Sequence, residues 1–302
     1  MPALADIIGA DSFSVPAASW HCGRYVLSLD RARVMGVLNV TPDSFSDGGR
    51  FAHLDAALAH ARQMIDDGVD IIDIGGESTR PGAPHIPAEV EMARVLPVLR
   101  ALQGANVPIS VDTSQPELMR AALELGASII NDVRSFGADG ALDAVRDGKC
   151  GIVLMHMQGN PATMQLQPVY DDVVAEVGRW LAQRRDRLEQ AGVAPERIAV
   201  DPGFGFGKTH WHNRQLLARL ERLLAVEQPL LVGLSRKSTL GEITGRPVMQ
   251  RLSASLAAAV IAVDKGARIV RVHDVAATRD AIAVLEAVRA EQRQEPLAGG
   301  TS

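Results

Sequence analysis

Short runs of Val, Ile and Leu alternate along the chain with longer stretches in which apolar residues recur every three to four positions. The short runs are typical of parallel strands covered on both faces, and the longer stretches are typical of amphipathic helices. The pattern predicts strands at residues 33–40, 69–76, 108–113, 128–133, 151–157, 197–203, 230–236 and 268–274. Helical sequence follows every strand and is clearest at residues 53–67, 90–102, 170–191 and 248–265.

Eight strand–helix units in succession predict a closed (β/α)8 barrel, the TIM-barrel fold, within a single domain. An open doubly wound sheet is the alternative, but no GxGxxG sequence follows the first predicted strand. We expect residues 33–292 to form the barrel, residues 1–32 to pack on it as a hairpin or strap, and residues 293–302 to fray. Glycines that can end a helix in the left-handed conformation precede four of the strands, at Gly68, Gly126, Gly192 and Gly266.

The composition and charge exclude several classes of protein. Hydrophobic residues make up 47% of the chain and charged residues 22%, which indicates a globular protein. The formal net charge of −5 opposes a broad basic surface, so we expect no nucleic-acid partner. Cys22 and Cys150 form no CxxC motif, and we expect both to be reduced. The N-terminus lacks a signal-peptide pattern and the apolar stretch 254–263 is too short to span a bilayer, so we expect a cytoplasmic protein without a membrane partner.

Polar residues stand at the predicted carboxyl end of nearly every strand. In a TIM barrel these ends meet at one mouth and form the active site. Clustered polar groups cost stability unless they bind something, so their presence predicts a ligand site. The polar residues at these predicted strand ends are Asn39, Asp112, Asn131, Asp201, Ser235, Lys237, Arg271 and His273.

The strand-end residues fall into two chemical groups. The first group offers hydrogen-bond acceptors and donors to a flat heterocycle rich in N–H and C=O groups, and consists of Asp112, Asn131, Asp201 and Lys237. The second group suits an anion and its metal ion, and consists of Thr79, Arg80, Arg271, His273 and Asn39. Within it, the amide oxygen of Asn39 is a suitable ligand for Mg²⁺. We therefore expect a pocket with one acidic end and one basic end that takes a heterocyclic phosphate ester.

Three other features have alternative interpretations. The glycine-rich segment 203–209 is not a P-loop, since Pro202 stands where GxxxxGK[ST] requires its first glycine. His210 and His212 have the HxH spacing of a zinc site, but no third ligand is near in sequence, so we expect solvated residues at a helix start. For His156, core packing and stacking on a heterocycle are equally compatible with the sequence.

Eight specific motifs occur in order along residues 33–290. They are GVLNVTPDSFSDGG (36–49), DIGGESTRPG (73–82), SVDT (110–113), IND (130–132), LMHMQG (154–159), DPGFGFGKT (201–209), SRKS (235–238) and RVHD (271–274). Together they closely resemble the motifs of the dihydropteroate synthase family, the pterin-binding TIM-barrel enzymes of folate biosynthesis. The resemblance covers nearly the whole barrel.

The resemblance implies a reaction that condenses 7,8-dihydropterin-6-ylmethyl diphosphate with 4-aminobenzoate to give dihydropteroate and diphosphate, with Mg²⁺ as cofactor. It implies that the pterin site consists of Asp112, Asn131, Asp201 and Lys237. The implied diphosphate site consists of Asn39, Thr79, Arg271 and His273, with Asn39 as the metal ligand. The implied 4-aminobenzoate site, where sulfonamides would compete, consists of Phe45, Arg80, Phe206, Ser235 and Lys237. The family also implies a homodimer, and we expect its interface at the Ala-rich surface 248–263.

The implied chemistry agrees with the residues present. An arylamine is a neutral nucleophile at pH 7, so no strong base is required, and the chain shows neither a Ser-His-Asp order nor a nucleophilic cysteine. We assign stabilisation of the departing diphosphate to Arg271 and His273, and stabilisation of the pterin methylene cation to Asp112 and the pterin contacts, which include Lys237. Two alternatives are a methyltetrahydrofolate–corrinoid methyltransferase and a pterin-binding paralogue that no longer turns over.

Aromatic residues are scarce, at 4% of the chain. Several phenylalanines fall on predicted strand-end loops, namely Phe45, Phe136, Phe204 and Phe206. We expect them to serve the aminobenzoate ring, because an aliphatic core has no need of them.

Overall fold

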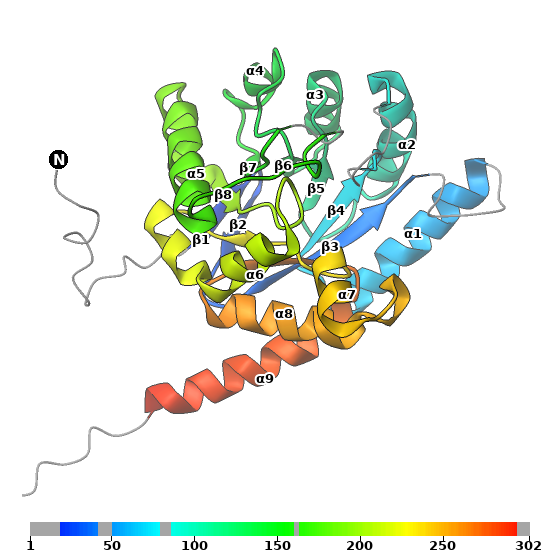
Figure 1. The fold of residues 1–302 in the computed structure, drawn as a ribbon. Helices are drawn as coiled ribbons and strands as arrows, with labels where there is room; N and C mark the ends of the chain where they lie inside the picture. Colours follow the sequence, from blue (N-terminus) through cyan, green and yellow to red (C-terminus); the bar gives the residue numbers. More distant parts are fainter. Residues whose placement is uncertain (1–18, 42–49, 79–85, 160–162, 295–302) are drawn as a thin grey trace, which may run out of the picture.

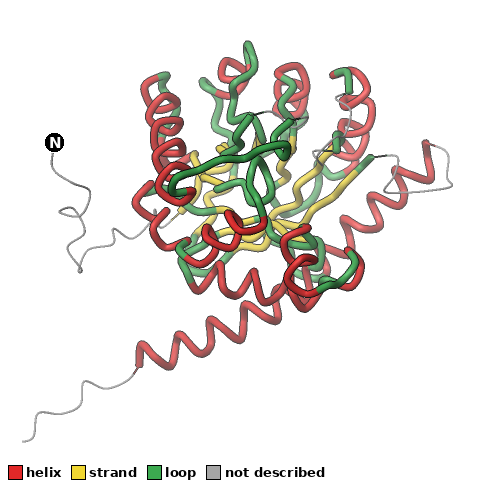
Figure 2. The backbone as a smooth tube through the Cα atoms, viewed as in Figure 1, coloured by secondary structure: helices red, strands yellow, loops and turns green. Residues whose placement is uncertain are grey.

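A ring of parallel strands surrounded by helices forms the body of the protein, as a computed structural model shows (Figure 1). The structure describes residues 19–41, 50–78, 86–159 and 163–294. Figure 2 shows the strands at the centre and the helices around them. The strands of the ring are β3 (Arg33–Asn39), β4 (Ile71–Gly75), β5 (Ile109–Asp112), β6 (Ile129–Asp132), β7 (Gly151–Met155), β8 (Ile198–Asp201), β9 (Leu231–Val232) and β10 (Ile269–Val272).

Helices connect each strand to the next. They are α1 (Arg50–Asp66), α2 (Ala88–Ala101), α3 (Pro116–Glu124), α4 (Ala141–Val145), α5 (Val173–Gln190), α6 (His210–Ala218), α7 (Ser238–Thr244), α8 (Leu252–Asp264) and α9 (Val275–Gln294). Short 3₁₀ helices extend three of the connections, η3 (Pro195–Arg197), η4 (Leu220–Val226) and η5 (Val248–Gln250).

The order of the strands confirms the predicted (β/α)8 barrel. Hydrogen-bonded neighbours run β8-β7-β6-β5-β4-β3-β10-β9, and every pair is parallel. A parallel bridge between Val200 and Leu230 joins the two ends of this order, and Val200 N donates to Pro229 O at 2.9 Å. Because all strands are parallel and the ring is closed, every carboxyl end lies at the same mouth.

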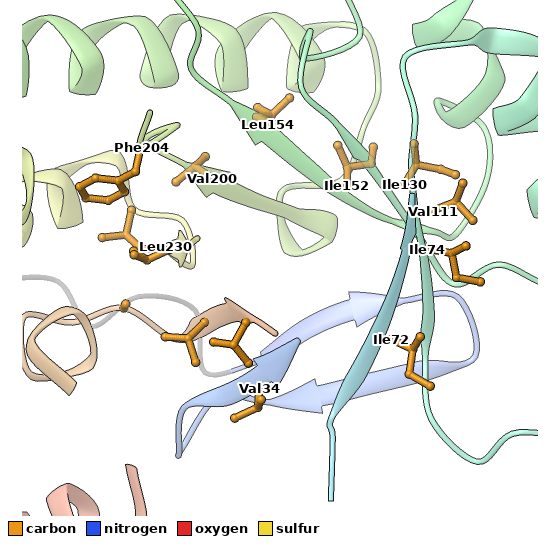
Figure 3. Packing of buried hydrophobic residues seen from close by; sticks show 14 of the residues in the cluster. Val34, Ile72, Ile74, Val111, Ile130, Ile152, Leu154, Val200, Phe204 and Leu230 are labelled. Atoms are coloured by element: carbon orange, nitrogen blue, oxygen red, sulfur yellow. The ribbon is translucent and has the colours of Figure 1, made fainter. Parts of the chain in front are cut away.

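Outward-facing side chains of the strands pack against the helices and form the main hydrophobic core. Figure 3 shows this layer with Val34, Ile72, Ile130 and Leu154 among its members. Phe204 belongs to the same core and is fully buried, and Phe136 is 3% exposed. The expectation that these two rings serve a ligand is therefore wrong, because the loops that follow β6 and β8 turn them inward to fill space between the barrel and its helices.

A hairpin closes the amino end of the barrel. It is formed by the antiparallel strands β1 (Ser19–Cys22) and β2 (Tyr25–Ser28). Trp20 and Cys22 are fully buried against inward-facing residues of the barrel, such as Met35 and Ile129. The indole Nε1 of Trp20 donates to Arg197 O at 2.8 Å, which satisfies its one polar group. Among the residues described, the hairpin therefore covers this end, and the strand ends expected to form a site lie at the opposite mouth.

Some element boundaries differ from the sequence prediction for identifiable reasons. Helix α5 begins later than predicted, because the carboxylate of Asp172 caps the first turn by accepting from Val174 N and Ala175 N. The predicted helix 248–265 is divided into η5 and α8, and the guanidinium of Arg251 donates to backbone oxygens around the break. The four expected helix-ending glycines all have positive φ. Within the residues described, no helix is both long and apolar enough to cross a membrane.

Candidate active site

The strand register of four neighbouring strands brings three predicted site residues into one row. Asn39 on β3 pairs with Gly75 on β4, Gly75 pairs with Asp112 on β5, and Asp112 pairs with Asn131 on β6. Asp201 ends β8 and Phe206 lies in the loop that follows it. The remaining described members come from the loop after β9 and the end of β10, and are Ser235, Lys237, Arg271 and His273. The predicted residues Phe45, Thr79 and Arg80 lie outside the described residues.

Arg271 joins the row to the interior of the barrel. Its Nε donates to Asp73 Oδ2 at 2.6 Å, and its Nη2 donates to Asp112 Oδ2 at 2.9 Å. Although burial opposes the charge, the carboxylates of Asp73 and Asp112 raise the pKa of Arg271 above its ordinary value. Arg271 is therefore always a cation held between two acids.

This contact corrects the expectation of separate acidic and basic ends. Arg271 is bonded to Asp112, so the charges of the site are interleaved. The reason is energetic, because a buried charge without a partner costs far more than a buried pair. Lys237 follows the same rule, since the carboxylates of Asp201 and Asp112 offset part of the burial that lowers its pKa to about 8.

Burial also shifts the proton equilibria of the acids. Burial raises the pKa of Asp112 to about 7, against the pull of Arg271, and Asp73 adds to the rise. Burial likewise raises the pKa of Asp201, whose Oδ1 accepts from Gly203 N at 2.7 Å. Asp112 is therefore poised to exchange a proton near neutral pH, and a buried carboxyl group with a raised pKa is typical of a functional site.

His273 contributes a hydrogen bond where a charge was expected. Burial, together with the cations Arg236 and Arg271, lowers the pKa of His273 to about 4. Its ring Nδ1 lies 3.0 Å from Ser235 Oγ, and its backbone N–H donates to the same oxygen at 3.3 Å. His273 is therefore neutral at pH 7 and is tied to the loop after β9.

The loop after β8 is built around a buried lysine. The Nζ of Lys208 donates to His156 Nδ1 at 2.9 Å, to Gly203 O at 3.0 Å and to Phe206 O at 2.9 Å. Gly203 has a φ of +68°, and a Cβ there would overlap His156 O. Lys237 in turn donates to Phe204 O and lies 4.8 Å from the centre of the Phe206 ring. The loop thus places Lys237 and Phe206 together at the mouth.

For His156, the structure favours core packing over stacking on a heterocycle. Its side chain is buried, and its ring meets the ring of Trp180 edge-on, with 5.1 Å between the ring centres.

His212 also differs from its prediction, because it is buried and forms a capping box with Thr209 at the start of α6. Its ring is therefore engaged in the fold and is not solvated.

The loop after β9 depends on an arginine that the sequence did not single out. Arg236 has a φ of +59°, which is unfavourable for a side chain with a Cβ. Its guanidinium forms two bonds to the carboxylate of Asp274, at 3.1 and 2.5 Å. This bidentate pair anchors the turn, so that Ser235 and Lys237 on either side of it remain at the mouth.

Three functional residues were missed from sequence, namely Asp73, Lys208 and Arg236. Each lies inside one of the eight sequence motifs, and this membership was the signal in the sequence that could have pointed to them. Motif membership could not separate them from their neighbours, because their roles depend on contacts with residues distant in the chain.

The donor set around Asn39 fits a hard cation held mainly by its substrate. Among the described residues, no three His, Cys, Asp or Glu side chains come together as a metal site. Gly75 has no side chain, which leaves space next to Asn39 and Asp112. A Cβ atom placed on Gly75 would lie 3.5 Å from Asn39 Oδ1 and 4.0 Å from Asp112 Oδ2. Mg²⁺ commonly takes one or two protein oxygens and completes its shell with water and phosphate.

A TIM barrel with paired acids and cations at its open mouth is the architecture of an enzyme for a polar, charged small molecule. Comparison with known proteins specifies the family. The family described as "Pterin binding enzyme" matches residues 35–273. The dihydropteroate synthase of Escherichia coli (strain K12) is 54% identical over 262 residues, which cover 86% of this chain and 93% of that protein. The dihydropteroate synthase of Neisseria meningitidis serogroup B (strain ATCC BAA-335 / MC58) is 51% identical over 276 residues, covering 89% and 97%.

Solved structures agree with these relatives. The Burkholderia cenocepacia dihydropteroate synthase complexed with 7,8-dihydropteroate is 50% identical, with a TM-score of 0.85, and covers 93% of this chain and 100% of that chain. The Xanthomonas albilineans enzyme with 4-aminobenzoic acid is 51% identical, with a TM-score of 0.86, covering 90% and 98%. The chain belongs to the dihydropteroate synthase family of pterin-binding enzymes.

Proposed function

We propose that this chain is a transferase that condenses 7,8-dihydropterin-6-ylmethyl diphosphate with 4-aminobenzoate to give 7,8-dihydropteroate and diphosphate. The observation that carries the proposal is the row of Asn39, Asp112 and Asn131 beside Arg271 at the carboxyl end of the barrel. Relatives at 51–54% identity are dihydropteroate synthases, and structures of such enzymes hold the product or 4-aminobenzoic acid.

The pterin ring binds beside Asp201 and Asn131. Asp201 and Asn131 are both more than 90% buried and offer oxygens to the N–H groups of a flat heterocycle. Lys237 supplies a donor to the ring carbonyl or ring nitrogen, and Asp112 faces the ring from β5. The buried surroundings strengthen each of these hydrogen bonds.

The diphosphate binds where Arg271 and His273 leave β10, with Thr79 as a further donor. Arg271 supplies a permanent charge and His273 supplies a ring N–H. Asn39 would hold Mg²⁺ through its amide oxygen, and that ion, when bound, neutralises charge on the diphosphate oxygens. Residues Asn39 and Asp112 flank the space beside Gly75 where this end of the ligand lies.

4-Aminobenzoate approaches over the loops after β8 and β9. Lys237 Nζ lies over the Phe206 ring there, and Ser235 stands two residues before Lys237 in the loop after β9. Arg80 and Phe45 complete this site in the proposal. A Yersinia pestis dihydropteroate synthase has been solved with a sulfonamide drug, and we expect sulfonamides to compete with 4-aminobenzoate here as well.

The chemical step exchanges a C–O bond for a C–N bond at the pterin methylene carbon. The C–O bond breaks and its electron pair leaves with the diphosphate, whose charge Arg271 and His273 stabilise. Asp112 stabilises the electron-poor pterin methylene through its negative charge. The amine nitrogen of 4-aminobenzoate donates its lone pair to that carbon and then releases one proton to solvent or diphosphate. Because the nucleophile is already neutral, no strong base takes part.

The assembly and location of the protein belong to the same proposal. We propose a cytoplasmic homodimer whose interface includes α8 and α9. Apolar residues of these packed helices face solvent, among them Leu252, Ile261, Val284 and Val288. Exposed apolar surface of this kind marks an interaction site on a globular protein.

A diphosphate-release assay with both substrates tests the function. Release that depends on 4-aminobenzoate supports the synthase, whereas binding of the pterin without release would favour a paralogue that no longer turns over. Arg271→Ala should lower turnover by roughly 10²–10³-fold, as removal of a transition-state donor does elsewhere. Arg289→Ala is the matched control, because Arg289 donates hydrogen bonds to Val263 and Asp264 on α8, away from the mouth.

A further inference from the structure

Asp73, in β4, is a fully buried carboxyl group beneath the proposed site. Its side chain is fully buried, whereas the side chain of Asp112 is 10% exposed and that of Arg271 is 23% exposed. A group without exposed surface has no direct access to a substrate that enters from the mouth. Any effect of Asp73 on the reaction therefore passes through the residues that it contacts.

A single oxygen of Asp73 contacts two residues of the proposed site. Its Oδ2 accepts from Arg271 Nε at 2.6 Å and from Asn131 Nδ2 at 3.4 Å. Its Oδ1 has no hydrogen-bond partner among the described residues. In the sheet order, β10 lies two strands from β4 on one side and β6 lies two strands away on the other. One carboxylate oxygen thus links the two halves of the site across the barrel interior.

These contacts determine which atoms of the two residues face the ligand. With Nε on Asp73 and Nη2 on Asp112, the guanidinium of Arg271 has a fixed plane, and its Nη1 makes no hydrogen bond to any residue described. With its NH₂ group directed at Asp73, Asn131 turns its carbonyl oxygen away from Asp73. Arg271 then offers N–H groups to an anion, while Asn131 offers an acceptor to an N–H group of the heterocycle.

We propose that Asp73 is a positioning residue that fixes Arg271 and Asn131 together, and so aligns the diphosphate-binding and pterin-binding parts of the site. The proposal rests on the proposed function for the identity of the ligands. It differs from a merely structural role, because most of its effect on turnover requires Arg271 to be present.

A double-substitution experiment separates these roles. We expect Asp73→Ala to lower kcat by about 10²-fold, the loss typical of a misplaced reacting group, with the KM for 4-aminobenzoate within about twofold of wild type. In the Arg271→Ala background, the same substitution should lower kcat by no more than about threefold further, because the shorter contact, to Arg271, is gone and only the 3.4 Å contact to Asn131 remains. Asp73→Asn, which retains an acceptor for Arg271, should lose less activity than Asp73→Ala.

Asp70→Asn is the matched control, since Asp70 is a buried acid that binds Arg31, Arg33 and Arg279 away from the mouth. We expect it to lower thermal stability but leave kcat unchanged. Losses from Asp73→Ala and Arg271→Ala that multiply, or a fall in kcat from Asp70→Asn equal to that from Asp73→Ala, would overturn the proposal. If wild-type protein shows no turnover, the proposed function fails. In that case, calorimetry with inorganic diphosphate and with 6-hydroxymethyl-7,8-dihydropterin decides the inference. Asp73→Ala must weaken the binding of both ligands, and unchanged binding overturns the inference.

Discussion

Glu91, in the first turn of α2, is a buried carboxyl group next to the site. Its Oε2 accepts from Thr113 Oγ1 at 3.0 Å, and its Oε1 has no partner among the described residues. Burial raises the pKa of Glu91 to about 8, although the hydrogen bond from Thr113 opposes the rise. The group is therefore mostly protonated at pH 7, and its ionisation at higher pH costs stability.

The sign of this cost gives a prediction for Glu91→Gln. The pKa of Glu91 in the folded state lies above its unfolded value of 4.5. The stabilisation that the protonated group gives the folded state is therefore complete below pH 4.5, and it is lost as the pH rises to about 8. Each unit of pKa shift corresponds to roughly 1.4 kcal/mol. Urea unfolding should show that the free energy of unfolding of the variant, relative to wild type, increases between pH 5 and pH 8. An equal pH dependence in both proteins would show that Glu91 ionises without penalty.

Lys237 gives a second prediction from a single residue. Burial lowers its pKa to about 8, so the protonated form is lost as the pH rises through that value. If the charge on Lys237 binds substrate, kcat/KM should decline above about pH 8. Lys237→Arg retains its charge to higher pH, and its profile should lack this decline even if its activity is lower throughout. Lys265→Arg, which alters an outer-surface lysine paired with Glu221, should keep the wild-type profile.

Among the elements, the loop after β9 shows how distant contacts position a site. The strained turn at Arg236 is held by Asp274, so Asp274→Ala should release Ser235 and Lys237. We expect the KM for 4-aminobenzoate to rise about tenfold, with a smaller change in pterin affinity, because a bidentate charged pair contributes about 1.5–3 kcal/mol. Asp264→Ala, which removes the partner of Arg289 on the outer surface, is the control and should leave both unchanged. Steady-state kinetics with each substrate varied in turn would test this, and an unchanged KM in Asp274→Ala would contradict it.

Elements of this kind differ in how far sequence predicts them. The barrel strands were predictable because strands buried on both faces read as continuous apolar runs. The strand predicted at 230–236 is only Leu231–Val232, because the chain turns towards Arg236 and its contact with Asp274. The inward turn of Phe204 and the role of Asp73 were not predictable, since both depend on packing and register between segments far apart in the chain.

At the scale of the whole molecule, the overall charge does not describe the site. The chain carries a net charge of −5, yet the open mouth presents Arg271 and Lys237 to an incoming anion. The hairpin at the opposite end buries Trp20 and leaves that end closed. A charged ligand that enters the mouth therefore meets local cations, whatever the sign of the net charge.

The exposed apolar residues of α8 and α9 give a prediction about assembly. Ile261 is 43% exposed and Val284 is 66% exposed, on two helices that pack against each other. A homodimer through this surface should sediment with twice the 32.2 kDa mass of the chain. Replacing both residues with Glu should give a monomer, because each buried carboxylate at an apolar interface would be unpaired. Val26→Glu, which changes an equally exposed valine on the hairpin, should remain a dimer. A monomeric wild type would exclude the dimer. A dimer that survives both substitutions would place the interface elsewhere.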